Sequence, residues 1–110
     1  MEIKILTYDE QLVFDLLGKP SASIGDRIEI ADQVRLIYDG SIKQKAIGLP
    51  EIVNFTLTYG SNVAAGVIAA WLYDKLKGRK VEKLIIERTE VEIDEGQIRK
   101  VIEEQVEFER

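Results

Sequence analysis

The segment from Ser61 to Lys77, SNVAAGVIAAWLYDKLK, constrains the fold of this chain more than any other part of its sequence. It predicts a helix, with Ser61 or Asn62 as its N-cap and Gly78 at its end. About two turns of this helix carry almost no side-chain bulk, because they consist largely of Ala64, Ala65, Gly66, Ala69 and Ala70. A neighbouring element must therefore approach the helix backbone closely.

Three interpretations of that neighbour are open. The spacings Ala65-xxx-Ala69 and Gly66-xxx-Ala70 suit close packing, and packing on the chain's own sheet is favoured. Self-association through the same residues is the second interpretation. Membrane contact is the third, because aromatic rings before a run of lysines suit a headgroup region, although the apolar run Val63–Tyr73 is only about half the length that spans a bilayer. The candidate interaction residues are Ala65, Gly66, Ala69, Ala70, Trp71 and Tyr73.

Composition excludes several classes of chemistry. At 110 residues, with 45% hydrophobic and 32% charged residues, the chain is expected to form one globular domain, 1–110. It contains no histidine and no cysteine, which excludes a zinc site and nucleophilic catalysis by Ser–His or Cys–His pairs. We expect no catalytic residue, cofactor or metal. The first residues, MEIKILTYDE, carry no apolar stretch of signal-peptide length, so a cytoplasmic location is expected.

A basic patch follows the small-residue helix. Lys75, Lys77, Arg79 and Lys80 lie close together in a chain whose net charge is -5. Cations near a helix C-terminus interact favourably with the helix dipole. We therefore favour the interpretation that the basic patch stabilises the end of this helix. Binding of phosphate or of an acidic partner is the alternative. General nucleic-acid binding is not expected of an acidic protein with one local basic patch.

Carboxylates gather in one loop-rich segment, at Asp26, Glu29, Asp32 and Asp39. Paired carboxylates can perform acid–base chemistry or hold Mg²⁺ or Ca²⁺. Their spacing matches no metal-binding loop, however, and Asp26 and Asp39 are typical turn residues. A carboxylate-based or metal-dependent enzyme is therefore the least favoured function.

The first half of the chain alternates between strand and turn signals. In order, it predicts a strand over Glu2–Leu6, a helix from Thr7 to Gly18, β-like runs over Arg27–Ala31 and Val34–Tyr38, and a loop over Ser41–Pro50. Thr7-Tyr8-Asp9-Glu10 is a capping box that opens the helix. Asp39-Gly40 is a turn pair, and the two β-like runs form either one bent strand or two strands.

The second half predicts a strand over Val53–Tyr59, the small-residue helix, a strand over Val81–Glu87, a return strand over Glu90–Ile93 and a last helix. A helix starting at Pro50 is the competing interpretation of residues 50–59. Asp94 is the N-cap of the last helix, with Gln97 three residues later. The buried stripe of that helix is Ile98, Val101, Ile102 and Val106.

This order of elements predicts an α+β fold. We expect a mostly antiparallel sheet with two or three helices packed on one face. A ferredoxin-like core, built from split β-α-β units and followed by a C-terminal helix, fits the order best.

Residues 51–105 resemble a recurrent family of small bacterial and archaeal domains. The pattern comprises a small-residue helix, a Trp-Leu pair, a short basic glycine turn, a β-hairpin with an alternating exit, and a final helix. The first three parts are here Val63–Ala70, Trp71-Leu72 and Lys77-Gly78-Arg79-Lys80, and the hairpin and its exit are Leu84–Ile86 and Val91-Glu92-Ile93-Asp94. This resembles the effector-associated constant component domains of bacterial conflict and signalling systems. The resemblance implies a non-enzymatic adaptor encoded beside variable effectors, and it supplies no catalytic residue.

Together these observations favour a non-enzymatic adaptor or protein-interaction module. We expect it to contact a second copy or a protein partner through the helix at 61–77 or through the sheet edge. The first alternative is a peripheral membrane protein that uses the apolar helix 63–73.

Overall fold

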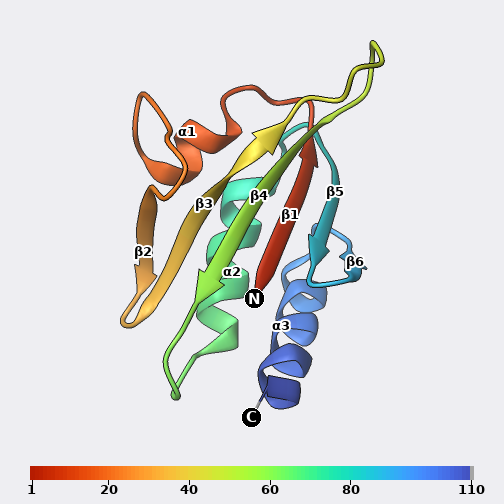
Figure 1. Ribbon diagram of the computed structural model, residues 1–110. Coiled ribbons are helices and arrows are strands. Elements are labelled where there is room, and N and C mark those ends of the chain that lie inside the picture. The colour runs from red at the N-terminus through yellow and green to blue at the C-terminus, as the bar shows by residue number, and fades with distance from the viewer. Residues whose placement is uncertain (110) are drawn as a thin grey trace.

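The fold is a six-stranded antiparallel sheet with three helices (Figure 1). A computed structural model describes residues 1–109, and within them the strand order is β2-β3-β4-β1-β5-β6. The elements are β1 Glu2–Thr7, α1 Leu12–Leu17, β2 Arg27–Ala31, β3 Val34–Ile42, β4 Glu51–Thr58, α2 Ala65–Leu76, β5 Val81–Ile86, β6 Thr89–Val91 and α3 Glu95–Glu109. The predicted α+β class and antiparallel sheet are confirmed.

The core lies between one face of the sheet and the helices. Alternate residues of the strands are buried, as in Ile3 and Ile5 of β1 or Phe55 and Leu57 of β4. The buried residues of the three helices join them in a single cluster that includes Leu16, Ile68, Leu72 and Ile98. This inner face is therefore the helix-covered one, and the opposite outer face carries the half-buried and exposed residues of each strand.

Helix α2 connects two strands that are not neighbours. Strands β4 and β5 both pair antiparallel with β1, so they run parallel to each other on either side of it. The unit β4-α2-β5 thus has the strand order of a split β-α-β motif. The ferredoxin-like core as a whole stays a prediction, since the sheet has two further edge strands, β2 and β6, and α1 covers only 6 residues.

The predicted start of the first helix is wrong. Thr7 is the last residue of β1, and its Oγ1 accepts a hydrogen bond from the Asp9 N–H and donates one to the Lys80 carbonyl. The Asp9 carboxylate then accepts from the Gln11 N–H, and α1 begins only at Leu12. These side chains form local turns in place of a capping box. The predicted end is confirmed at Gly18, whose φ of 66° is left-handed.

The segment 27–42 forms two strands, which resolves the choice between one bent strand and two. The turn between β2 and β3 holds Gln33 at φ 60°. The predicted turn at Asp39-Gly40 is wrong, because β3 continues to Ile42 through a register shift between Tyr38 and Gly40. Gly40 adopts φ 106°, so it serves a β-bulge that bends the strand. The predicted strand at 53–59 is confirmed as β4, and the competing helix is not formed.

The two long helices begin differently. Ala64, not Ser61 or Asn62, is the N-cap residue of α2, and it makes no side-chain capping bond, so that predicted cap is wrong. Helix α3 is capped as predicted, because the Asp94 carboxylate accepts a hydrogen bond of 3.0 Å from the Gln97 N–H. Its residues Ile98, Ile102 and Val106 are buried and Val101 is half-buried, in agreement with the predicted stripe.

Candidate interaction surface

The close neighbour of the small-residue helix is α3 of the same chain. At Gly66, a Cβ atom would lie 3.7 Å from the guanidinium group of Arg99, which is an ordinary van der Waals contact. Ala69 is fully buried, Ala65 is half-buried and Ala70 is exposed. An open hollow of about 540 Å³ separates residues 63–67 from the C-terminal half of α3. The small residues at the start of α2 therefore border α3 across this hollow, where the Arg99 side chain is the neighbour of Gly66.

Trp71 and Tyr73 lie half-buried at the flanks of α2. The Lys75 ammonium group lies 5.9 Å from the ring centroid of Trp71, and that of Lys77 lies 5.8 Å from the ring of Tyr73. Lys77 also forms an ion pair of 3.2 Å with Asp74. Each lysine thus interacts with a residue of its own helix.

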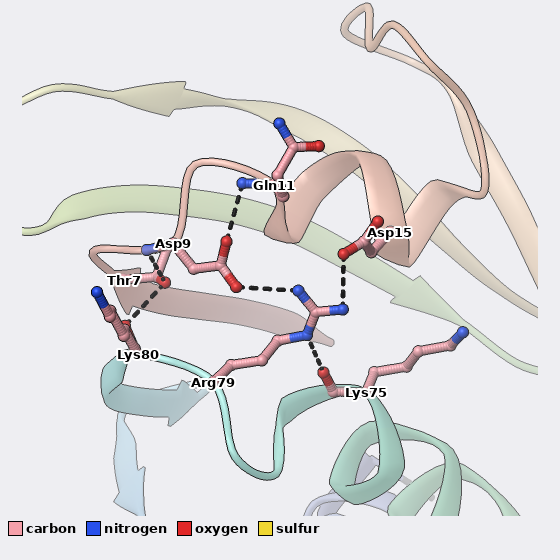
Figure 2. A network of polar contacts seen from close by, with 7 residues as sticks. All are labelled: Thr7, Asp9, Gln11, Asp15, Lys75, Arg79 and Lys80. Atoms are coloured by element: carbon pink, nitrogen blue, oxygen red, sulfur yellow. Dashed lines mark hydrogen bonds and ion pairs between the residues drawn. The ribbon is translucent and has the colours of Figure 1, made fainter.

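Arg79 is the central residue of a polar network between distant parts of the chain (Figure 2). Its Nη1 donates to the Asp9 carboxylate at 2.9 Å, its Nη2 lies 2.7 Å from Asp15, and its Nε donates to the Lys75 carbonyl at 2.8 Å. The hydrogen bond to Asp15, and after it the one to Asp9, raises the pKa of Arg79 above its ordinary value. We call this group, Thr7, Asp9, Asp15, Arg79 and the Lys80 carbonyl, the Arg79 corner.

The predicted basic patch therefore does not converge on one anion site. Arg79 is committed to two carboxylates and Lys77 to Asp74, whereas the Lys80 side chain is exposed. Figure 2 shows the side chains of Lys75 and Lys80 on opposite sides of the Arg79 guanidinium group. The corner joins the β1–α1 connection to the α2–β5 connection, which is a structural role.

The four carboxylates of the segment 26–39 also stay apart. Asp26 accepts from the Ser23 N–H and pairs with Lys19, and Asp39 accepts from the Thr56 hydroxyl. Glu29 and Asp32 are exposed. Within residues 1–109, no group of three or more acidic side chains is placed to hold a metal ion.

A surface that the sequence did not indicate lies at the connection between β3 and β4. In Figure 1 this hairpin extends well beyond the rest of the sheet. Its loop, residues 43–50, carries Ile47, which is fully exposed, and Leu49, which is half exposed. Of the seven large hydrophobic side chains exposed within residues 1–109, three come from this hairpin: Ile42, Ile47 and Leu49.

The exposed apolar residues continue onto the outer face of the sheet. Ile42 lies opposite Ile52, and Ile52 lies opposite Leu6, so the three form one row across β3, β4 and β1. Tyr8, also half exposed, borders with Leu49 a hollow of about 300 Å³ at the base of the loop, on the side of Thr7 and Glu51 and thus on the opposite face from this row. We call Leu6, Tyr8, Ile42, Ile47, Leu49 and Ile52 the hairpin patch.

Polar groups frame the hairpin patch. The Gln44 side chain donates a hydrogen bond of 2.8 Å to the Pro50 carbonyl, which closes the loop on itself. Lys43 and Lys45 precede the apolar tip and are exposed. Exposed apolar side chains that gather at one end of a fold and carry a polar rim mark interaction sites on protein surfaces. The sequence reasoning missed this one because residues 41–50 show no periodicity. The available signal was a pair of aliphatic residues, Ile47 and Leu49, on either side of Gly48 and directly before Pro50.

Comparisons with protein-family models, curated proteins and solved structures found no match to this chain. Within residues 1–109, no helix has both the length and the apolar character needed to cross a membrane.

Proposed function

We propose that this protein is a non-enzymatic interaction module, an adaptor that binds a partner protein through the hairpin patch. The observation that carries the proposal is the complete exposure of Ile47 at the end of a projecting hairpin. Apolar area that is removed from water contributes about 25 cal/mol per Å², so a partner that covers this tip gains affinity without any rearrangement of the core.

The patch also indicates the chemistry of the partner. A projecting aliphatic residue fits an apolar pocket, and the lysines at 43 and 45 fit carboxylates at the rim of that pocket. The resemblance of residues 51–105 to constant component domains supports an adaptor role, and a cytoplasmic location stays a prediction. Helix α2 offers less exposed apolar surface for association than the hairpin patch does. Ala69 lies in the core, and of the central residues 65–70 only Val67 and Ala70 are exposed.

The test is affinity capture from the native organism followed by titration with the purified captured protein. The variant Ile47→Ser/Leu49→Ser is compared with wild type and with Phe108→Ser, which removes another exposed apolar side chain, from α3. We expect wild type and Phe108→Ser to bind the captured protein alike and the hairpin variant to lose binding by more than tenfold. Equal binding by all three proteins would remove the hairpin patch from consideration.

Contact with a membrane surface is a second candidate, and the same hairpin favours it. Ile68, Ala69 and Leu72 of the expected membrane helix 63–73 are buried in the core. Ile47 and Leu49, by contrast, follow two exposed lysines, which suits the boundary between acyl chains and anionic headgroups. Co-flotation with anionic and with neutral vesicles tests it: binding to anionic vesicles that Ile47→Ser/Leu49→Ser abolishes supports this candidate, and no binding at low salt rejects it.

A further inference from the structure

Strand β2 presents a free backbone edge. It is the outermost strand of the sheet, beside β3. The Tyr38 N–H donates to the Asp26 carbonyl at 2.8 Å, which identifies the pair 26/38 as hydrogen-bonded. Such pairs alternate along an antiparallel ladder, and the register pairs Arg27 with Ile37 and Glu29 with Arg35. The N–H and C=O groups of Arg27 and Glu29 therefore point away from β3, toward solvent.

The side chains on this edge carry opposite charges on one face. Leu36 is fully buried and lies opposite Ile28, so Ile28 faces the helices, and Arg27 and Glu29 face outward. Both charged side chains are exposed, and neither has an ion-pair partner within residues 1–109. Charged residues usually protect edge strands from pairing. In a cross-strand pair, however, like charges directly opposite each other are destabilising and opposite charges are stabilising.

A second copy of β2, related to the first by a two-fold axis, can pair with this edge. In one register, opposite charges of the two copies then face each other. We consider registers in which the helices of both copies lie on the same side of the joined sheet. The two-fold axis then passes beside residue 27, 28 or 29, and the residue at the axis lies opposite its own copy. Centres at Arg27 or Glu29 place identical charges opposite each other. The centre at Ile28 places each Arg27 opposite Glu29 of the partner subunit, and it joins the free N–H and C=O groups of both residues in hydrogen-bonded pairs.

The other edge of the sheet lacks these features. Strand β6 has only 3 residues, and its Glu90 already lies 3.9 Å from Lys83 of β5. At β2, the half-buried Ile28 would meet its own copy and lose its remaining exposed surface. Charge, hydrogen bonding and apolar contact thus favour the same arrangement.

We propose that two copies of this chain pair antiparallel through β2, with Arg27 opposite Glu29 of the partner subunit, to form one continuous sheet. This pairing uses a surface separate from the hairpin patch and does not depend on the proposed partner binding. The joined sheet would present two projecting hairpins, one from each copy.

The test is sedimentation equilibrium over a range of protein concentrations, in low and in high salt. We expect wild type to dimerise, and to do so less in high salt. Arg27→Glu and Glu29→Arg should each weaken dimerisation by about tenfold or more, because each converts two attractive pairs into two repulsive ones. The double variant Arg27→Glu/Glu29→Arg should restore dimers. A mixture of the two single variants should form heterodimers, since their charges again match.

Three controls separate this edge from other surfaces. Arg88→Glu reverses an exposed charge in the β5–β6 turn and should dimerise as wild type does; so should the hairpin variant Ile47→Ser/Leu49→Ser. Thermal unfolding confirms that each variant is folded. Amide exchange of Arg27 and Glu29 should slow as concentration rises. A monomer at every concentration, or dimers that charge reversal at β2 leaves unchanged, would overturn the proposal.

Discussion

The Arg79 corner and the hairpin patch lie at the same end of the sheet but are built in opposite ways. Thr7 of β1 pairs with Glu51 of β4 on one side and with Val81 of β5 on the other, so the two regions are neighbours. The corner joins the β1–α1 connection and helix α1 to the α2–β5 connection by ion pairs and hydrogen bonds of 2.7–3.0 Å. The hairpin tip, in contrast, carries aliphatic side chains that pack against little of the core.

The contacts of the corner thus stabilise the fold, whereas the exposed tip is available for the binding that we propose. The corner holds the ends of β1 and β5 in position and engages all three nitrogen atoms of the Arg79 guanidinium group. The tip adds little to the core, so its sequence is free to serve a partner. The base of the hairpin, where β3 bends at Gly40, divides the exposed tip from the part of the sheet that the corner stabilises.

The largest effect is expected at that base. Gly40→Ala should lower the free energy of unfolding by about 1–3 kcal/mol, because φ 106° is unfavourable for a residue with a Cβ and that atom would lie 3.2 Å from the Ile24 side chain. Urea denaturation measures the change. Gly48→Ala is the matched control: its φ of 87° is also positive, but nothing lies within 4 Å and the tip can relax, so the loss should be smaller. Equal losses would show that the tip is as constrained as the base.

A smaller loss is expected at the corner. Arg79→Ala should destabilise the protein by about 1–2 kcal/mol, since it removes hydrogen bonds to two carboxylates and a carbonyl from a partly buried position. Arg99→Ala is the control, because its ion pair with Glu103 is a solvent-exposed i,i+4 pair on α3, so its removal should change the free energy of unfolding less. Chemical denaturation of both variants gives the comparison. A change at Arg79 no larger than that at Arg99 would contradict the structural role of the corner.

The contrast also explains which features the sequence predicted. Strand β4 and helix α3 follow from local signals, namely the alternation of Val53, Phe55 and Leu57 and the cap at Asp94. The start of α1 and the end of β3 do not. Thr7 looks like a helix cap, but the Lys80 carbonyl, 73 positions away, engages its hydroxyl. Asp39 looks like a turn residue, but it accepts a hydrogen bond from Thr56 on the neighbouring strand.

The candidate sites, too, depend on contacts between distant residues, which local sequence patterns do not predict. Arg79 belongs to a basic cluster in the sequence, and only the fold brings Asp9 and Asp15 to it. The small-residue stripe was expected to permit close approach of a neighbouring backbone, yet the atoms nearest to a Cβ at Gly66 belong to the Arg99 side chain of α3, a neighbour that no local pattern specifies. The hairpin patch depends on a cross-strand row, Ile42, Ile52 and Leu6, which requires the register of three strands.

Substitutions at the tip should leave stability almost unchanged. Ile47→Ser and Leu49→Ser should each alter the free energy of unfolding by less than about 0.5 kcal/mol, because these side chains are exposed and fill no core cavity. The measurement is the same denaturation series. A loss of more than about 1 kcal/mol from either variant would show that the tip packs against the domain and is not a free surface.

The smallest effect is a change in the titration of Tyr8, the residue that touches both regions. Its hydroxyl donates a hydrogen bond of 3.1 Å to Glu82, and its ring borders the hollow beneath the loop with Leu49. The hydrogen bond to Glu82, then partial desolvation, then the charge of Glu82 raise the pKa of Tyr8 above 10.0. Because the pKa is raised in the folded state, this contribution to stability is present below pH 10 and is lost as the pH rises through the folded-state value.

An NMR titration of ¹³C-labelled tyrosine, assigned with Tyr8→Phe, measures this pKa. Glu82→Ala should lower the pKa of Tyr8, and Glu82→Gln should lower it less because the amide still accepts a hydrogen bond. Leu49→Ser should leave it unchanged if the hairpin tip is energetically independent of the corner. If Leu49→Ser shifts the pKa of Tyr8 as much as Glu82→Ala does, the two regions are energetically coupled, since the loop then controls the environment of the phenol. In that case a partner bound at the hairpin patch would also act on the strand ends that the Arg79 corner holds.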